Sequence, residues 1–236
     1  MLEAGLPVKA FFTDRAGGVS EAPYDTLNLA EHVGDDPQAV AANRAILAEL
    51  AGAPVTFMKP VHGAKVARIT TPGEEAPEAD ILVTSTPGVA LAALAADCVP
   101  VVAHDERTGA VAVAHIGRKG LYGGAVDNTL AAIADIRGSW GDLRSITVAI
   151  GPAICGTCYE VPATMRAEVS ARHPAAFAAT KWGTPSLDLP RAVEARFGEL
   201  GATIIRHSRC TFEDPELFSH RMDGVTGRQA AVVVCA

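Results

Sequence analysis

Residues 89–115 read VALAALAADCVPVVAHDERTGAVAVAH, and this stretch decides the fold. It holds three nearly continuous apolar runs, which are 89–95, 99–104 and 110–115. Continuous apolar character is typical of strands that are buried on both faces. Cys98 falls in the turn between two of these strands and His115 ends the third, so we expect both side chains to project from adjacent strand ends of one sheet.

Helical and strand patterns continue on both sides of this stretch. Further strands are expected at the apolar runs near 54–58, 65–70, 80–84, 145–150, 202–206 and 229–235, and 11–18 is expected to be a short strand that enters a Gly-Gly turn. Helices are expected near 121–136, 162–172 and 190–200. The pattern predicts an α/β (α+β) fold, a single domain over 1–236 in which helices flank mixed sheets as a layered sandwich.

One further helix has clear boundaries in the sequence. Asp36 is a good N-cap, Pro37 suits the first helical position, and Gly52 ends the helix. Its apolar stripe is expected to consist of Val40, Ile46, Leu47 and Leu50. Asn43 and Arg44 are expected on another part of the helix surface.

The composition excludes several classes of protein. The chain has 236 residues, of which 49% are hydrophobic and 20% charged, so it can bury a sizeable core and is not disordered. The formal net charge is -7, and Lys and Arg are scattered along the chain. Nucleic acid and anionic membrane are therefore poor partners, and a small-molecule substrate fits better.

The amino terminus and the cysteines predict a cytoplasmic protein. The first nine residues, MLEAGLPVK, lack the basic region and apolar stretch of a signal peptide, and no apolar run has the length of a membrane span. In the cytoplasm the five cysteines are expected to be reduced, and their odd number does not suggest a disulfide framework.

Three metal-capable residues, His62, Cys98 and His115, stand at the edges of apolar runs. One thiolate and two imidazoles suit zinc, and three protein ligands leave a coordination position open for water or substrate. Structural zinc sites usually bring their ligands in close pairs, whereas these residues are far apart in sequence, so the fold must assemble the site. The spacing also allows the opposite interpretation, a buried cysteine packed as a small hydrophobe and two histidines bonded to backbone carbonyls.

Short motifs stand in order along nearly the whole chain. They are Thr13-Asp14-Arg15-Ala16-Gly17-Gly18-Val19-Ser20, Pro23-Tyr24, Leu27-Asn28-Leu29, His32-Val33-Gly34-Asp35-Asp36-Pro37, Asn43-Arg44, Val61-His62-Gly63, Ala79-Asp80, Ala96-Asp97-Cys98-Val99-Pro100, Ala114-His115, Ile150-Gly151-Pro152, Tyr159-Glu160-Val161, Cys210-Thr211, Phe218-Ser219, Arg221 and Gly227-Arg228-Gln229-Ala230. In this combination the chain resembles the YfiH-like, or laccase-domain, family.

The resemblance implies a zinc-dependent purine nucleoside phosphorylase that also acts as an adenosine deaminase and on methylthioadenosine. It assigns the metal to His62 of the Val-His-Gly motif, Cys98 of the Ala-Asp-Cys motif and the histidine that follows, His115. Members of the family have also been described as polyphenol oxidases, and bacterial members as factors that correct peptidoglycan precursors. Zinc lowers the pKa of water toward roughly 7, which makes hydroxide available to attack C6 of adenine.

Phosphorolysis needs groups that bind an anion, because phosphate attacks C1′ of the ribose while the purine leaves with developing negative charge. Guanidinium and backbone N–H groups bind phosphate well. Arg15, beside a Gly-Gly pair, and Arg44 are the candidates. Asn28 and His32 match family positions and are expected to line the pocket, and Asp97 is expected to orient a ligand or relay a proton.

The chain departs from the family pattern beside His115. The family usually reads His-Ala-Gly-Trp-Arg-Gly there, whereas this chain reads HIGRKG, with Arg118 in place of Trp and Lys119 in place of Arg. If the family's arginine grips an anion through two parallel bonds, Lys119 offers only a point charge, so affinity or substrate choice is expected to differ. Pro60 likewise stands where a Gln commonly precedes Val-His-Gly.

Three other interpretations of the site stay open. A metal-free cysteine hydrolase would use Cys98 as nucleophile and His115 as base. A copper oxidase would use the same pocket for one-electron chemistry, although the seven histidines include no His-x-His pairs. The altered Arg118-Lys119 segment also allows a non-catalytic role in partner binding.

The remaining cysteines and histidines are expected to be structural. Cys155 and Cys158 form a C-x2-C pair, but no second C-x2-C pair accompanies it. His104 stands at a strand end as a candidate partner of a metal ligand, although a bond to its neighbour Asp105 is the simpler interpretation. His207 and His220 are expected to be structural or exposed. The oligomeric state does not follow from the sequence.

Overall fold

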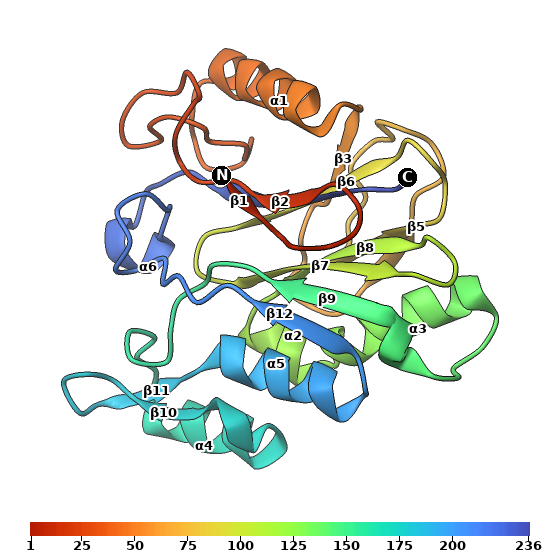
Figure 1. The fold of residues 1–236 in the computed structure, drawn as a ribbon. Coiled ribbons are helices and arrows are strands. Elements are labelled where there is room, and N and C mark those ends of the chain that lie inside the picture. The colour runs from red at the N-terminus through yellow and green to blue at the C-terminus, as the bar shows by residue number, and fades with distance from the viewer.

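Two mixed sheets pack face to face in the computed structural model, which describes residues 1–236 (Figure 1). The five-stranded sheet has the order β1 (Leu2–Glu3), β2 (Ala10–Phe12), β13 (Gln229–Val234), β6 (Ala90–Ala95) and β3 (Val55–Phe57). The six-stranded sheet has the order β12 (Thr203–Arg206), β9 (Ile146–Ile150), β7 (Val99–Asp105), β8 (Val111–Ile116), β5 (Ile81–Thr84) and β4 (Val66–Arg68). A separate antiparallel hairpin consists of β10 (Phe177–Ala179) and β11 (Pro185–Leu187).

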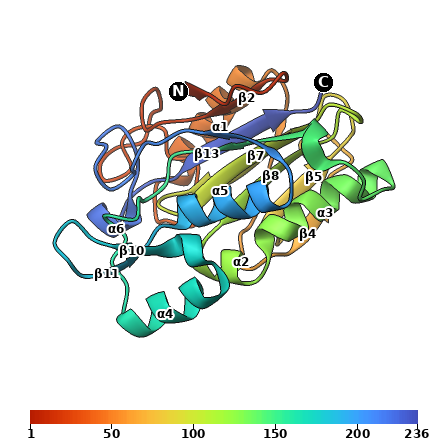
Figure 2. The ribbon, with the colours of Figure 1, turned by 60° about the horizontal axis from the view of Figure 1, so that its bottom comes forward.

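Helices cover the outer faces of both sheets, which makes the layered α/β sandwich that the sequence predicts. The helices are α1 (Pro37–Ala51), α2 (Arg118–Tyr122), α3 (Ala125–Arg137), α4 (Ala163–Arg172), α5 (Leu189–Glu199) and α6 (His220–Asp223), with 3-10 turns η1 (Leu143–Ser145) and η2 (Pro174–Ala176). Helix α1 packs on the five-stranded sheet, and α2, α3 and α5 lie over the six-stranded sheet (Figure 2). No helix is both long and apolar enough to cross a membrane.

The continuous apolar strands are buried on both faces, as predicted. In β6, Leu91 and Ala93 pack between the two sheets, whereas Leu94 packs in the layer beneath α1. In β7, Val102 packs between the sheets and Val101 packs under the helices. Because successive side chains point to opposite faces, a strand with a covering layer on each side needs an apolar residue at every position.

The boundaries of α1 are confirmed, but the prediction of its buried face is wrong at two positions. Asp36 caps the helix by accepting a hydrogen bond from the Gln38 backbone, and Gly52 ends it in the left-handed conformation. Asn43 is fully buried, whereas Leu50 is 38% exposed. The Asn43 amide accounts for this difference, because it donates to backbone oxygens and a hydroxyl of the 20–28 loop and accepts from the Val19 backbone.

The helix expected near 121–136 is broken into α2 and α3 by Gly123 and Gly124. Gly124 has a φ of 88°, in the left-handed region that interrupts a helix. The break lets α2 run close to the loop that carries His62. A Cβ at Gly120 of α2 would lie 2.7 Å from the Gly63 carbonyl oxygen, so only glycine permits this approach.

Other differences from the predicted elements are smaller. The strand expected over 11–18 is the shorter β2, and the structure adds β1, α6 and the hairpin β10–β11, which the sequence did not predict. The other predicted strands and helices are present within a few residues of their expected bounds.

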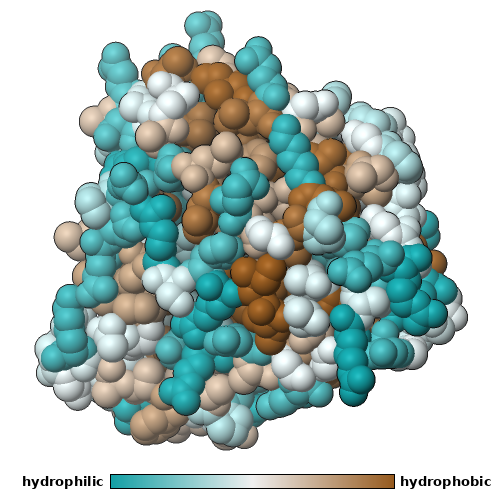
Figure 3. Space-filling model, viewed as in Figure 1, coloured by the Kyte–Doolittle hydropathy of each residue, from teal (hydrophilic) through white to brown (hydrophobic).

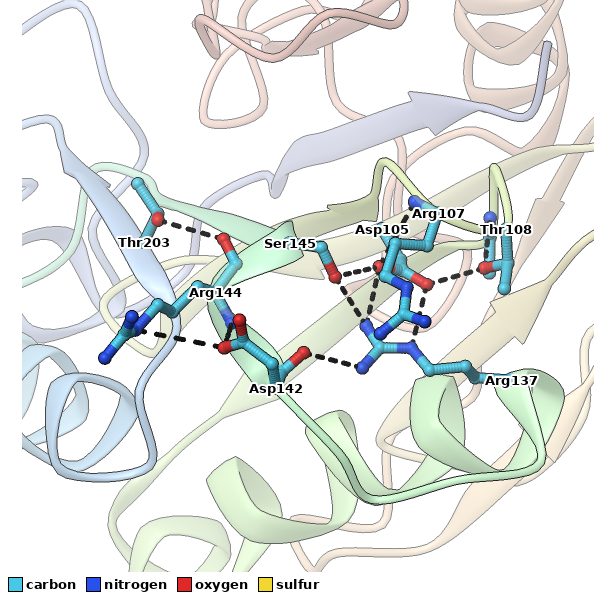
Figure 4. Close-up of polar contacts among 9 residues, drawn as sticks. Asp105, Arg107, Thr108, Arg137, Asp142, Arg144, Ser145 and Thr203 are labelled. Atoms are coloured by element: carbon cyan, nitrogen blue, oxygen red, sulfur yellow. Dashed lines mark hydrogen bonds and ion pairs between the residues drawn. The ribbon is translucent and has the colours of Figure 1, made fainter.

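A buried ion pair joins three elements on the side of the molecule shown in Figure 4. Arg137 ends α3 and donates to the Asp105 carboxylate at 2.7 Å, and the Ser145 hydroxyl donates to the same carboxylate. The Asp105 and Arg137 side chains are 0% and 4% exposed. This network fixes the carboxyl end of β7 against α3 and the start of β9.

On the face of the molecule seen in the view of Figure 1, hydrophobic and hydrophilic residues are intermixed. Hydrophobic residues form a group in the upper middle of this face and a smaller one near its centre, each bordered by hydrophilic residues (Figure 3). On this face, therefore, no single broad apolar surface stands out.

Candidate metal centre

The fold brings His62, Cys98 and His115 together where the chain passes between the two sheets. Cys98 lies in the connection between β6 and β7, and His62 lies in the connection between β3 and β4. His115 pairs with Pro100 across the β7–β8 ladder, next to Cys98, so the expectation of neighbouring strand ends is confirmed. One ligand atom from each residue lies within 4.8 Å of the other two.

Two residues at this junction have unusual backbone conformations. His62 has a φ of 58° and Asp97 a φ of 86°, in the left-handed region that side-chain-bearing residues seldom adopt. The Asp97 carboxylate is held in place by three donors: the Thr211 and Ser219 hydroxyls, each at 2.7 Å, and the Arg221 backbone N–H at 2.6 Å. Strain of this kind persists only where surrounding contacts enforce it, which is common at functional sites.

Asp80 lies beside the ring of His115. Its carboxylate oxygen is 3.7 Å from His115 Nδ1, and both side chains are buried. The Gly63 backbone, next to His62, donates to the other carboxylate oxygen at 2.9 Å. A carboxylate behind one ring nitrogen leaves the other nitrogen, Nε2, for a metal, as is usual for metal-binding histidines. Asp80 was not among the predicted site residues.

The electrostatics at His115 favour positive charge. Burial would lower the pKa of His115, but the neighbouring Asp80 carboxylate and Cys98 thiol raise it to about 9. The same position that stabilises a proton on the ring would stabilise a bound cation. A thiol and two imidazoles form a donor set that suits zinc or copper.

Gly117 leaves the space that a metal at this site would need. A Cβ at Gly117 would lie 3.0 Å from Cys98 Sγ and 3.9 Å from His62 Cδ2. Any larger residue would press on the thiol. The donor set, the oriented histidine and this open space all fit a three-ligand metal centre.

The trio opens into a cavity of about 320 Å³. Its lining residues are His32, Pro60, His62, Leu94, Ala95, Ala96, Asp97, Cys98, His115, Tyr159, His220, Arg221 and Arg228. A second, more open depression shares His62, Cys98 and Tyr159 with it and adds Arg118 and Lys119. The trio therefore stands between a cavity with two arginines and an outer depression with two further cations.

The structure brings some of the predicted substrate residues to this cavity and holds others away. Asp97 and Lys119 lie beside the trio, and so does His32. Arg15 and Arg44 do not line the cavity. Asn28 is fully buried beside it, where its side-chain oxygen accepts from the Arg228 backbone, so it supports the wall without reaching the open space.

Arg15 and Arg44 are committed to other partners. Arg15 donates to the Asp25 backbone oxygen and lies over the Phe218 ring. Arg44 donates to the Leu29 backbone oxygen, pairs with Glu31 and lies over Phe57. These contacts use the guanidinium groups to hold loops, away from the residues that line the cavity.

Several cavity residues were not among the predicted set. Tyr159 and Arg228 belong to motifs of the family resemblance, and this was the only sequence signal for them. His220, expected to be structural or exposed, lines the cavity. His104 lies at the opposite end of β7 from Cys98, about 20 Å away along the strand, so it is not a partner of the metal ligands.

The fold and this site define a class of mixed α/β proteins with a candidate three-residue metal centre at the junction of two sheets. The chain belongs to the family described as multi-copper polyphenol oxidoreductase laccase, whose model matches residues 9–236.

The family description and the names of similar proteins point to two different chemistries. The chain is 47% identical to a purine nucleoside phosphorylase of Streptomyces coelicolor, over 94% of this chain and 93% of that protein. It is 45% identical to a purine nucleoside phosphorylase of Mycobacterium tuberculosis, over 96% of this chain and 91% of that protein. The family description names an oxidoreductase, whereas these relatives are named as phosphorylases.

Solved structures show the same fold. YlmD from Geobacillus stearothermophilus superposes with a TM-score of 0.89 at 32% identity, covering 99% of this chain and 95% of that chain. Protein NMB0706 of Neisseria meningitidis superposes with a TM-score of 0.86 at 33% identity, covering 97% of this chain and 95% of that chain.

Proposed function

We propose that this protein is a zinc-dependent purine nucleoside phosphorylase that also deaminates adenosine and cleaves methylthioadenosine. The observation that carries the proposal is the convergence of His62, Cys98 and His115 within 4.8 Å at the mouth of a cavity lined by arginines. The names of relatives at 45–47% identity support the reaction. The five free cysteines suit a cytoplasmic protein. We propose a small nucleoside and phosphate as its ligands.

The metal would be held by the trio, with Asp80 orienting His115. When bound, zinc supplies a Lewis acid and lowers the pKa of water. Gly117 keeps the space beside Cys98 free, and Asp97 holds the turn that presents the thiol. With three bonds already accepted by its carboxylate, Asp97 is assigned to positioning Cys98 and not to proton relay.

Arg228 is the residue that we assign to anion binding inside the cavity. One terminal nitrogen donates to the backbone oxygens of Thr226 and Gly227, and the other two guanidinium nitrogens make no hydrogen bond within the protein. A guanidinium fixed through one nitrogen is preorganised to offer the rest to phosphate. Lys119 adds a point charge on the other side of the trio.

Tyr159 is the aromatic group that we assign to stacking against the purine. It lines both the cavity and the outer depression, and the Arg221 guanidinium lies 4.9 Å from its ring centroid. Arg221 also donates to the Glu160 backbone oxygen at 2.8 Å. The ring is therefore held on one side by Arg221, which stabilises the cavity wall. Because the family's expected Trp is Arg118 here, Tyr159 is the aromatic platform that remains.

The test is the identity of the products. Purified protein is incubated with inosine, adenosine and methylthioadenosine, with and without phosphate, and the purines are separated by chromatography. We expect hypoxanthine from inosine only with phosphate. Adenosine should give inosine without phosphate, and with phosphate that inosine should be cleaved further to hypoxanthine. Turnover of none of the three nucleosides, or release of bases that is independent of phosphate, would contradict the proposal.

A cysteine hydrolase is the second candidate, and the proximity of Cys98 and His115, whose ligand atoms lie within 4.8 Å, favours it. A thiol beside a histidine is the usual arrangement of a cysteine nucleophile and its base. Alkylation of Cys98 separates the candidates: zinc should protect the thiol from iodoacetamide, and a chelator should remove the protection. Labelling that does not respond to chelator would favour the hydrolase. Oxidation of a phenol by the copper-loaded protein would instead support the oxidase.

A further inference from the structure

A second cluster of metal-capable side chains lies outside the cavity. Cys155, Cys158, Cys210 and Glu213 each place one ligand atom within 4.8 Å of the others. Cys155 and Cys158 form the C-x2-C pair of the loop after β9, and the other two residues come from the loop after β12. In sequence the C-x2-C pair stands without a second pair, and only the fold supplies its partners.

We propose that Cys155, Cys158, Cys210 and Glu213 form a second metal site, a closed tetrahedral zinc site that joins the two loops carrying the cavity walls. Three thiolates with a carboxylate are a ligand set that zinc accepts, and four protein ligands leave no open position. With zinc–sulfur bonds of about 2.3 Å, tetrahedral ligands lie about 3.8 Å apart, so ligand atoms that lie within 4.8 Å of one another need to close by no more than about 1 Å. The site is independent of the proposed phosphorylase activity.

The local backbone already has the form of a metal-binding turn. The Cys155 N–H donates to Cys210 Sγ at 3.3 Å, and the Cys155 thiol and the Thr157 hydroxyl are hydrogen-bonded at 3.0 Å. Such bonds stabilise a thiolate and orient it. Cys158 is 2% exposed and its backbone N–H donates to the Cys155 carbonyl, which closes the turn.

Lys181 offsets the charge that this ligand set would carry. Three thiolates and one carboxylate carry four negative charges, so with a divalent cation the site would have a net charge of minus two. The Lys181 ammonium lies 2.8 Å from the Glu213 carboxylate, at the tip of the β10–β11 hairpin. One carboxylate oxygen can therefore bind the metal while the other keeps the lysine, as outer partners of metal ligands usually do.

The position of the cluster explains what the site would do. Tyr159 directly follows Cys158, and Arg221 lies on α6 beyond Glu213. These two residues meet at the cavity, where Arg221 donates to the Glu160 backbone. A metal at the base of both loops would hold this contact in register.

The test measures zinc per chain in variants that separate the two sites. We expect two zinc ions in the wild-type protein and in the Cys235→Ser control, whose thiol is buried away from both sites. Cys98→Ser should keep one zinc, that of the cluster, and Cys158→Ser should keep only the other. Cys98→Ser that holds no zinc after incubation with zinc chloride and desalting would overturn the proposal.

Two further measurements cover a folding failure and a disulfide. Glu213→Gln removes an exposed ligand, so it should fold, and a chelator should strip its cluster zinc at least about tenfold faster than from Glu216→Gln, a matched change in the same loop. Equal rates in the two variants would overturn the proposal.

Thiol titration of the denatured protein without reductant should find all five cysteines. A deficit of two thiols, regained with reductant, would show a disulfide in place of the metal.

Discussion

The space around the Cys98 thiol depends on a neighbouring glycine, Gly117. Gly117 faces the thiol across the site, and any Cβ there would lie 3.0 Å from Cys98 Sγ. Its φ of -85° is open to every residue, so the glycine is required for space and not for backbone freedom. A substitution at Gly117 should therefore affect metal binding without affecting folding.

We therefore expect Gly117→Ala to weaken zinc binding at the trio by about tenfold or more while the protein stays folded. Gly141→Ala is the matched control, because a Cβ there meets nothing closer than 3.9 Å. Competition with a chromophoric chelator measures the affinity, and circular dichroism checks the fold. Equal affinity in the two variants would show that the thiol does not face the metal.

Lys119→Arg tests the departure from the family pattern. An arginine offers a planar pair of donors where lysine offers a point charge, so KM for phosphate should fall. Deamination should change much less, because water is then the nucleophile. The phosphate KM and both activities are measured side by side. An equal effect on both reactions, or none on either, would place the anion site at Arg228 alone.

The sequence predicts individual residues only where their chemistry is local. His62, Cys98 and His115 could be found from residue type and from the family motifs. The contacts that hold Arg15 and Arg44 away from the cavity could not be predicted, because their partners Asp25, Leu29 and Glu31 come from loops whose paths the sequence does not specify.

At the scale of elements, the Asp105–Arg137 pair joins β7 to α3 without contact to the site. Removing one charge leaves the other buried and uncompensated, which typically costs about 3–5 kcal/mol. Asp105→Asn should lower the free energy of unfolding by about that amount. Asp142→Asn, at the exposed Arg144 pair, should cost less than about 1 kcal/mol. Urea unfolding measures both, and equal losses would contradict the assigned role of burial.

The same pair predicts a pH dependence. Burial would raise the pKa of Asp105, but hydrogen bonds from Arg137, Ser145 and Thr108 outweigh it and hold the pKa below its ordinary value. A lowered pKa in the folded state means that the stabilisation is present above about pH 4 and is lost as the pH falls below it. The stability difference between wild type and Asp105→Asn should therefore be constant from pH 6 to 8 and shrink in acid. A difference that grows in acid would contradict this sign.

Elements with strong local signals could be predicted, and those fixed by distant contacts could not. The cap and stop of α1 are local, so its ends are confirmed. Its buried face is not, because Asn43 is buried by the 20–28 loop. The hairpin β10–β11 was missed because its strands have three residues each and one is largely exposed.

At the scale of the whole molecule, the candidate site lies where the chain passes from one sheet to the other. Both connections from the five-stranded to the six-stranded sheet, β3 to β4 and β6 to β7, carry a residue of the candidate metal trio. The sequence predicts mixed sheets and places these residues at strand ends, but it does not predict which strands belong to which sheet. The separation into two sheets follows from long-range pairing, which residue patterns do not encode locally.

The most direct test of the central claim is phosphate-dependent release of hypoxanthine from inosine by Cys98→Ser, with zinc per chain measured on the same samples. In Cys98→Ser we expect the trio's zinc to be lost and the rate to fall more than about 100-fold. Cys235→Ser should keep the trio's zinc and the wild-type rate. A Cys98→Ser protein that cleaves inosine at the wild-type rate would contradict the account. So would a Cys98→Ser protein that binds as much zinc as the wild type.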